Sequence, residues 1–153
     1  MFAAIRNGCS EVLSSPLGRD PLNCSLLIVE DDPDQLEALV RWFVRAGYEV
    51  TGVDHPIQAL DAASVRQFQV ALLDASLPEM DGFLLMQRLN LQQACMQFII
   101  LSGHDNLERR ANSDGAFAHL AKPCKLALMQ VTVEGAFKRA RDELTAREQP
   151  AGS

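Results

Sequence analysis

Strand-like apolar segments alternate with helix-like segments along most of this chain, and the alternation limits the folds available to it. Leu26–Val29 is a continuous apolar run, as expected for a strand covered on both faces. Pro33 suits a first helical turn, and apolar residues then recur at helical spacing up to a stop at Gly47. The other predicted strands lie at 49–53, 68–73 and 97–101 and within 115–121, and the other predicted helices at 56–64, 83–91, 106–113 and about 126–147. This order predicts an α/β fold, a parallel sheet with helices on both faces.

The length of the chain fits a single domain with short flanking segments. With 153 residues it can bury a sizeable core in one unit. Turn residues without sustained periodicity fill the start, so residues 1–24 are predicted to be a poorly structured leader. We place the domain at 25–147 and expect a frayed tail at 148–153.

Composition and charge disfavour several classes of function. The net charge of −6 argues against direct binding to nucleic acid. No apolar run approaches the roughly 20 residues of a membrane span, and the start lacks the apolar stretch of a secretory signal. The four cysteines show no C-x-x-C spacing, which disfavours a zinc site or a disulfide framework and favours a cytoplasmic protein.

Acidic residues follow two of the predicted strands. The cluster Glu30-Asp31-Asp32 comes after the first strand, and Asp74 comes at the end of the third. The carboxyl ends of parallel strands share one edge of the sheet, where ligands bind, so Asp31, Asp32 and Asp74 are expected to converge. Three neighbouring carboxylates repel one another unless their pKa values rise or a cation enters. Oxygen ligands in an open, wet site favour Mg²⁺.

A simpler interpretation of the first cluster stays open, because acids beside Pro33 can serve only to begin a helix. The position of Asp74 at an equivalent strand end favours the shared cation site. Pro78 and Gly82 shape a tight connection after Asp74, which would hold that carboxylate exposed and fixed. A carboxylate in this setting can attack phosphorus and form an aspartyl phosphate, with magnesium neutralising the oxygens involved.

Two further residues follow strands at the same edge. Ser102 ends the fourth predicted strand, where its hydroxyl could donate to a phosphoryl oxygen or simply cap a turn before Gly103. Lys122 ends the fifth strand before Pro123, and a cis peptide bond can precede a proline in such a turn. Alone, Lys122 would be taken for a surface lysine, but the shared edge favours a pair with Asp74.

Together these segments resemble the receiver domain of bacterial response regulators. The resemblance covers residues 25–144 and rests on four motifs in order: Glu30-Asp31-Asp32, the segment from Asp74 to Gly82, Leu101-Ser102-Gly103 and Lys122-Pro123. It implies a doubly wound, flavodoxin-like three-layer fold with five parallel strands in the order 2-1-3-4-5. It also implies that Asp74 receives a phosphoryl group from a histidine kinase or a histidine phosphotransfer protein.

The resemblance further assigns a role to each residue of the site. Asp32 and Asp74 would ligate Mg²⁺ directly with the backbone carbonyl of Ser76, and Asp31 would act through water. Ser102 and Lys122 would bind the phosphoryl group. The aromatic switch position of the family, three residues before the lysine, is His119, which could change the output, add sensitivity to pH or be an ordinary half-buried histidine.

Two other features depart from the pattern of the family. The interval between Ser102 and Lys122 is about two residues short, which should shorten the fourth helix, and Cys124 replaces a frequent phenylalanine. The last predicted helix is long. Its apolar stripe, from Leu126 to Leu144, should pack the first half of the helix on the sheet, and the second half could project, fray or form a homodimer. These features leave phosphorylation intact and affect the choice of partner.

The sequence therefore predicts a stand-alone receiver that switches a contact with another protein and assists its own phosphorylation and dephosphorylation. It is not expected to be an enzyme in the usual sense, and no attached output domain is expected. Two alternatives stay open. One is a receiver-like binding module that works without phosphate. The other is an aspartate-nucleophile phosphatase, but that class typically has a second acid where this chain has Ser76. A flavin-binding relative of the same fold is disfavoured, because the first strand leads to acids.

Overall fold

The computed structural model describes residues 5–6, 25–103 and 115–148. The predicted helix at 106–113, most of the leader and most of the tail lie outside these residues. Within the described residues, no helix is both long enough and apolar enough to cross a membrane.

A single sheet forms the centre of the molecule. Its strands are β1 (Ile5–Arg6), β2 (Ser25–Val29), β3 (Glu49–Val53), β4 (Val70–Asp74), β5 (Gln97–Ser102) and β6 (Ala118–Ala121). They are arranged in the order β1-β3-β2-β4-β5-β6. The five strands from β2 to β6 are parallel, and counted from β2 they have the order 2-1-3-4-5, which confirms the predicted fold class.

The sixth strand, β1, was not predicted and lies within the segment expected to be a leader. Ile5 pairs with Gly52 and Arg6 with Thr51, antiparallel to β3. An edge strand presents unpaired backbone N–H and C=O groups, so any extended segment of the chain that reaches it can add to the sheet. The pairing involves only two residues and their backbone groups, so a pattern of apolar side chains could not predict it.

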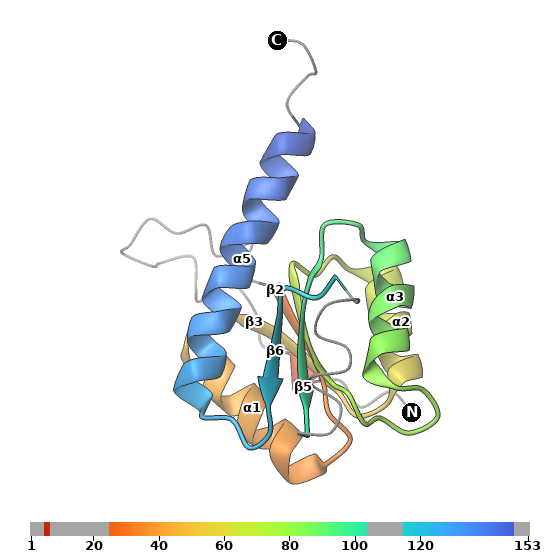
Figure 1. Ribbon diagram of the computed structural model, residues 1–153, viewed down its shortest axis with the longest axis vertical. Coiled ribbons are helices and arrows are strands. Elements are labelled where there is room, and N and C mark those ends of the chain that lie inside the picture. Colours follow the sequence, from red (N-terminus) through yellow and green to blue (C-terminus); the bar gives the residue numbers. More distant parts are fainter. Residues whose placement is uncertain (1–4, 7–24, 104–114, 149–153) are drawn as a thin grey trace.

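Helices cover both faces of the sheet, as the alternation of elements predicts. Figure 1 shows α1 and α5 on one side of the strands and α2 and α3 on the other. Their bounds are α1 Pro33–Arg45, α2 Pro56–Val65, α3 Gly82–Gln92 and α5 Leu126–Glu148. Two buried clusters result, one between the sheet and α2–α3 and one between the sheet and α1–α5.

Helix α1 shows how local sequence signals produce these elements. Asp32 caps its first turn, and Pro33 occupies the first helical position, where its missing N–H is harmless. Gly47 has a φ of +99°, a left-handed conformation that ends the segment and that glycine adopts without strain. The inward stripe consists of Leu36, Leu39, Val40 and Phe43, all buried.

Helix α5 packs on the sheet along its first four turns. The predicted apolar stripe is buried at Met129, Val133, Ala136, Phe137 and Ala140. Leu144, the last member of the stripe, is 43% exposed, and Figure 1 shows the end of α5 extending past the sheet. The first half of the helix therefore behaves as predicted, and its last turns project.

Candidate functional site

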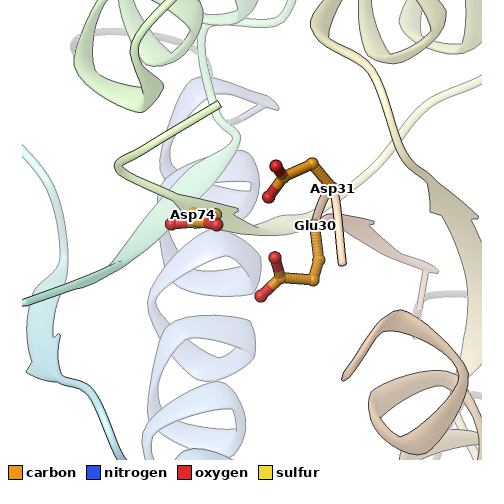
Figure 2. A group of neighbouring side chains, drawn as sticks. All are labelled: Glu30, Asp31 and Asp74. Atoms are coloured by element: carbon orange, nitrogen blue, oxygen red, sulfur yellow. The ribbon is translucent and has the colours of Figure 1, made fainter. Parts of the chain in front are cut away.

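Three carboxylates from two neighbouring strands meet at the carboxyl edge of the sheet. Glu30 and Asp31 follow β2, and Asp74 is the last residue of β4, which pairs with β2. One carboxylate oxygen from each lies within 4.8 Å of the others, and Figure 2 shows the three side chains side by side at the ends of these strands. Glu30 and Asp74 are only 2% and 4% exposed, whereas Asp31 faces solvent. The cluster is therefore closed on its inner side and open on its outer side.

Lys122 contributes the positive charge of the site. Its ammonium nitrogen lies 3.1 Å from Asp74 Oδ2 and 3.1 Å from Glu30 Oε1. The residue follows β6, and the peptide bond to Pro123 is cis. One ammonium group cannot balance three ionised carboxylates, so the pocket retains an excess of negative charge for a cation or a proton to neutralise.

Burial and crowding change the ionisation of the inner residues. The pKa of Glu30 is raised from 4.5 to about 7, first by burial and then by the hydrogen bond and the charge of Asp74. The backbone N–H of Asp32 and the ammonium of Lys122 oppose this rise only in part. Burial alone would lower the pKa of Lys122, but the hydrogen bond to Glu30 and the negative charges of Asp74 and Glu30 outweigh it and raise the pKa.

The structure corrects the position expected for Asp32. We expected this carboxylate to converge with Asp31 and Asp74, but it caps α1 and accepts hydrogen bonds from the backbone N–H groups of Asp34, at 2.9 Å, and Gln35, at 3.3 Å. Glu30 occupies the place in the cluster that was expected for Asp32. The signal was in the sequence, because Pro33 at the first helical position makes the preceding residue the N-cap. The acids nearer to the strand are then the ones that face the edge of the sheet.

The loop from Ala75 to Asp81 is bound closely to Asp74. The backbone N–H of Ser76 donates to Asp74 Oδ1 at 3.0 Å, and the N–H of Gly82 donates to the carbonyl of Ala75 at 2.9 Å. A Cβ atom on Gly82 would lie 2.3 Å from the carbonyl oxygen of Asp74, so only glycine permits α3 to begin this close to the site. The use of the Ser76 carbonyl as a metal ligand stays a prediction.

Ser102 lies at the same edge as Asp74 and Lys122. It is 1% exposed and ends β5, and its hydroxyl donates to the carbonyl of Gly103 at 3.1 Å. The backbone N–H of Lys122 donates to the carbonyl of Ser102 at 2.8 Å, which aligns the ends of β5 and β6. The structure therefore brings the predicted residues of β4, β5 and β6 to one edge, while the phosphoryl contacts of Ser102 stay a prediction.

His119 lies on β6 opposite Ile100 of β5. Its ring stacks on Phe83 at the start of α3, with ring centroids 5.9 Å apart. Its Nδ1 atom is buried and has no hydrogen-bond partner among the described residues. The histidine thus occupies an aromatic environment, and a role as a switch stays a prediction.

Comparisons with known proteins show what the chain as a whole is similar to. The family model of the response regulator receiver domain matches residues 26–134. The chain is 33% identical over 117 residues to the transcriptional activator protein PfeR of Pseudomonas aeruginosa, a match that covers 76% of this chain and 38% of that protein. It is 26% identical over 127 residues to the phosphoglycerate transport system transcriptional regulatory protein PgtA of Salmonella typhimurium, covering 82% of this chain and 31% of that protein. The chain thus spans about a third of the length of these relatives.

A solved structure shows the same likeness in three dimensions. The response regulator receiver domain protein (CheY-like) of Methanospirillum hungatei superimposes with a TM-score of 0.72 at 26% identity. The superposition covers 78% of this chain and 97% of that one. The similarity therefore spans the receiver-like part of the chain almost completely.

Proposed function

The chain belongs to the response regulator receiver domain family, whose members are phosphoacceptor signalling modules, and on that premise we propose that Asp74 is its phosphoryl acceptor. Receiver domains are phosphorylated by histidine kinases, and the donor here is a histidine kinase or a histidine phosphotransfer protein. The observation that carries the proposal is the contact of Lys122 with both Asp74 and Glu30 beside an open acidic cluster.

The transfer is a displacement at phosphorus. A carboxylate oxygen of Asp74 attacks the phosphorus of a phosphohistidine, a P–O bond forms, the P–N bond breaks and the imidazole of the donor leaves with its electron pair. Lys122 lies where its ammonium can follow the charge from the carboxylate to a phosphoryl oxygen. Ser102, buried at the end of β5, would bind a second phosphoryl oxygen once its hydroxyl turns away from Gly103.

The acidic cluster fits a magnesium ion. Oxygen ligands alone, an exposed carboxylate on Asp31 and an excess of negative charge are the features that Mg²⁺ sites share. We propose that Asp31, Asp74 and the backbone carbonyl of Ser76 hold the ion, with Glu30 acting through water. When bound, Mg²⁺ would neutralise charge on the phosphoryl oxygens.

The output of the switch is a changed contact with another protein. The relatives named above are transcriptional regulatory proteins about three times the length of the matched segment, so they do not define the partner of this chain. Two statements stay predictions: that the receiver acts without an attached output domain, and that it forms a homodimer. A binding module that works without phosphate is the remaining alternative.

Intact-mass analysis after exposure to acetyl phosphate tests this proposal. Wild-type protein should gain the mass of one phosphoryl group with Mg²⁺ and none with EDTA. The variant D74N should gain nothing, and D61N, which changes an exposed aspartate on α2, should behave as the wild type. Phosphorylation of D74N to the level of the wild type would refute the assignment. A wild-type protein that gains no phosphoryl group but still binds another protein would favour the module that works without phosphate.

A further inference from the structure

A side-chain contact joins two loops at the rim of the site. His55 precedes α2, and its Nε2 atom lies 3.1 Å from Oε2 of Glu79, which belongs to the loop after Asp74. These loops follow β3 and β4, strands that are separated in the sheet by β2. The contact therefore reaches across the end of β2, the strand that Glu30 and Asp31 follow.

The second nitrogen of the His55 ring is also occupied. Nδ1 accepts a hydrogen bond from the backbone N–H of Ile57 at 3.2 Å, which caps the first turn of α2. A nitrogen that accepts carries no proton, so this hydrogen bond assigns the ring proton to Nε2, which then donates to the Glu79 carboxylate. Both ring nitrogens are thus used, and the ring is held between a helix end and the loop.

Glu79 has an unusual backbone conformation. Its φ of +66° lies in the left-handed region, which a side chain with a Cβ atom rarely adopts. A residue stays in such a conformation only when its surroundings hold it there. The bond from His55 acts at this residue, three positions after Ser76 in the sequence.

We infer that His55 is a positioning residue for the cation site: through Glu79 it holds the 75–81 loop so that the Ser76 carbonyl faces the carboxylates. The hydrogen bonds of Ser76 to Asp74 and of Gly82 to Ala75 fix the two ends of the loop. In its middle, the backbone N–H of Met80 donates to the carbonyl of Pro78 at 2.7 Å, and the His55–Glu79 contact ties this turn to the start of α2. This inference rests on the proposed function, because the loop matters only if the cluster binds a cation.

Three single variants and one double variant separate the contact from its surroundings. H55N keeps a side chain that caps helices well but is too short to replace the reach of His55 to Glu79. E79A removes the partner, and E79Q keeps an acceptor oxygen in its place. The double variant H55N/E79A removes both ends of the contact.

Two readouts apply to these proteins. Hydrogen–deuterium exchange of the 75–82 segment without metal should be about two- to fivefold faster in H55N and E79A, as expected for loss of an exposed charged contact. Calorimetric Mg²⁺ affinity should weaken by a similar factor, the double variant should be no worse than either single one, and E79Q should stay close to the wild type. Exchange in β5 should be unchanged, which shows that the fold is intact.

Several results would overturn the inference. If the 75–82 segment of H55N and E79A exchanged at the rate of the wild type, the contact would not hold the loop. If the fold-changes of the two single variants multiplied in the double variant, the two residues would act independently. E79Q as impaired as E79A would show that only the charge of Glu79 matters. A wild-type protein that binds no Mg²⁺ or takes no phosphoryl group would instead refute the proposed function, while the metal-free exchange still tests the contact.

Discussion

Glu30, Asp74 and Lys122 form the inner half of the site, whereas Asp31, Ser76 and the His55–Glu79 contact lie at its rim. The inner three are buried or half-buried and bind one another directly, with both distances from the ammonium equal to 3.1 Å. They are brought together by the ends of strands, which the sheet fixes. The rim residues are exposed or belong to loops, and they are held by single hydrogen bonds and by the His55–Glu79 contact rather than by the pairing of strands.

Because of this difference, inner and rim residues should contribute differently to folding and to cation binding. An inner residue takes part in a network of buried charges, so its loss affects both folding and chemistry. A rim residue contacts solvent on one side, so its loss should change cation affinity with little effect on folding. Variants can therefore test whether the division between the halves of the site is real.

The largest effect is expected for K122M. This change leaves two buried carboxylates without their positive partner and removes the group that would bind the phosphoryl oxygen. Phosphorylation by acetyl phosphate should fall by about 100-fold, the scale seen when a charge-stabilising donor is lost. The matched control K125M changes an exposed lysine of the same turn and should leave the rate unchanged. A K122M protein phosphorylated at the rate of the wild type would refute a role for Lys122 in binding the phosphoryl group.

The variant D31N should affect the rim alone. Asp31 is exposed and has one oxygen within 4.8 Å of the other two carboxylates, so under the proposed function it is the ligand that a cation would meet from solvent. Its loss should weaken Mg²⁺ binding by about tenfold, as expected when a coordinating group or its support is removed. Thermal unfolding without metal should stay near that of the wild type. A large loss of stability would show that Asp31 belongs with the inner residues.

The variant E30Q tests the inner half through pH. Glu30 has a pKa of about 7 in the folded protein and 4.5 as its ordinary value. Below 4.5 it is protonated in both states, so its contribution to folding is fully present there. As pH rises towards 7 the unfolded state has already released the proton that the folded state retains, so folding becomes less favourable.

Denaturant unfolding in EDTA at pH 5 and pH 8 measures this contribution. The wild type should lose stability between these values, relative to E30Q, by an amount on the order of 2 kcal/mol. Glutamine does not titrate, so E30Q should show a flatter profile over the same interval. Parallel profiles for the two proteins would mean that Glu30 is ionised in the folded state throughout.

The sequence was sufficient for Asp74 and Lys122, two of the three inner residues, because the ends of strands are set by strong patterns, but it placed Asp32 where the structure has Glu30. Mostly apolar segments predicted the strands that place Asp74, Ser102 and Lys122 at one edge, and all three residues lie there. At the rim, Asp31 and Ser76 were named as candidates from the sequence, but the His55–Glu79 contact was not, because it depends on single residues in turns. The contact between His55 and Glu79 joins residues 24 positions apart through one unusual φ angle, and no periodicity signals such a contact.

The first acidic cluster shows the same limit at the scale of one residue. Three consecutive acids, from Glu30 to Asp32, offered three ways to assign the pair that faces Asp74. The side-chain direction of each depends on where the strand ends and the helix begins. Glu30 turns inward because its backbone N–H still donates to the carbonyl of Val53 in β3, whereas Asp32 already serves α1.

The smallest effects, expected for Asp32, can settle this assignment. As a helix cap, Asp32 can be replaced by asparagine with little change, and D32A should reduce stability by about 1 kcal/mol. As a direct metal ligand it would resemble D31N, and D32N would weaken Mg²⁺ binding about tenfold. We expect D32N to bind Mg²⁺ within about twofold of the wild type and D32A to unfold more easily, because the carboxylate of Asp32 accepts from Asp34 and Gln35 rather than facing Asp74. Calorimetric titration of D31N and D32N side by side distinguishes the two assignments, since only one of these neighbouring changes should remove a ligand.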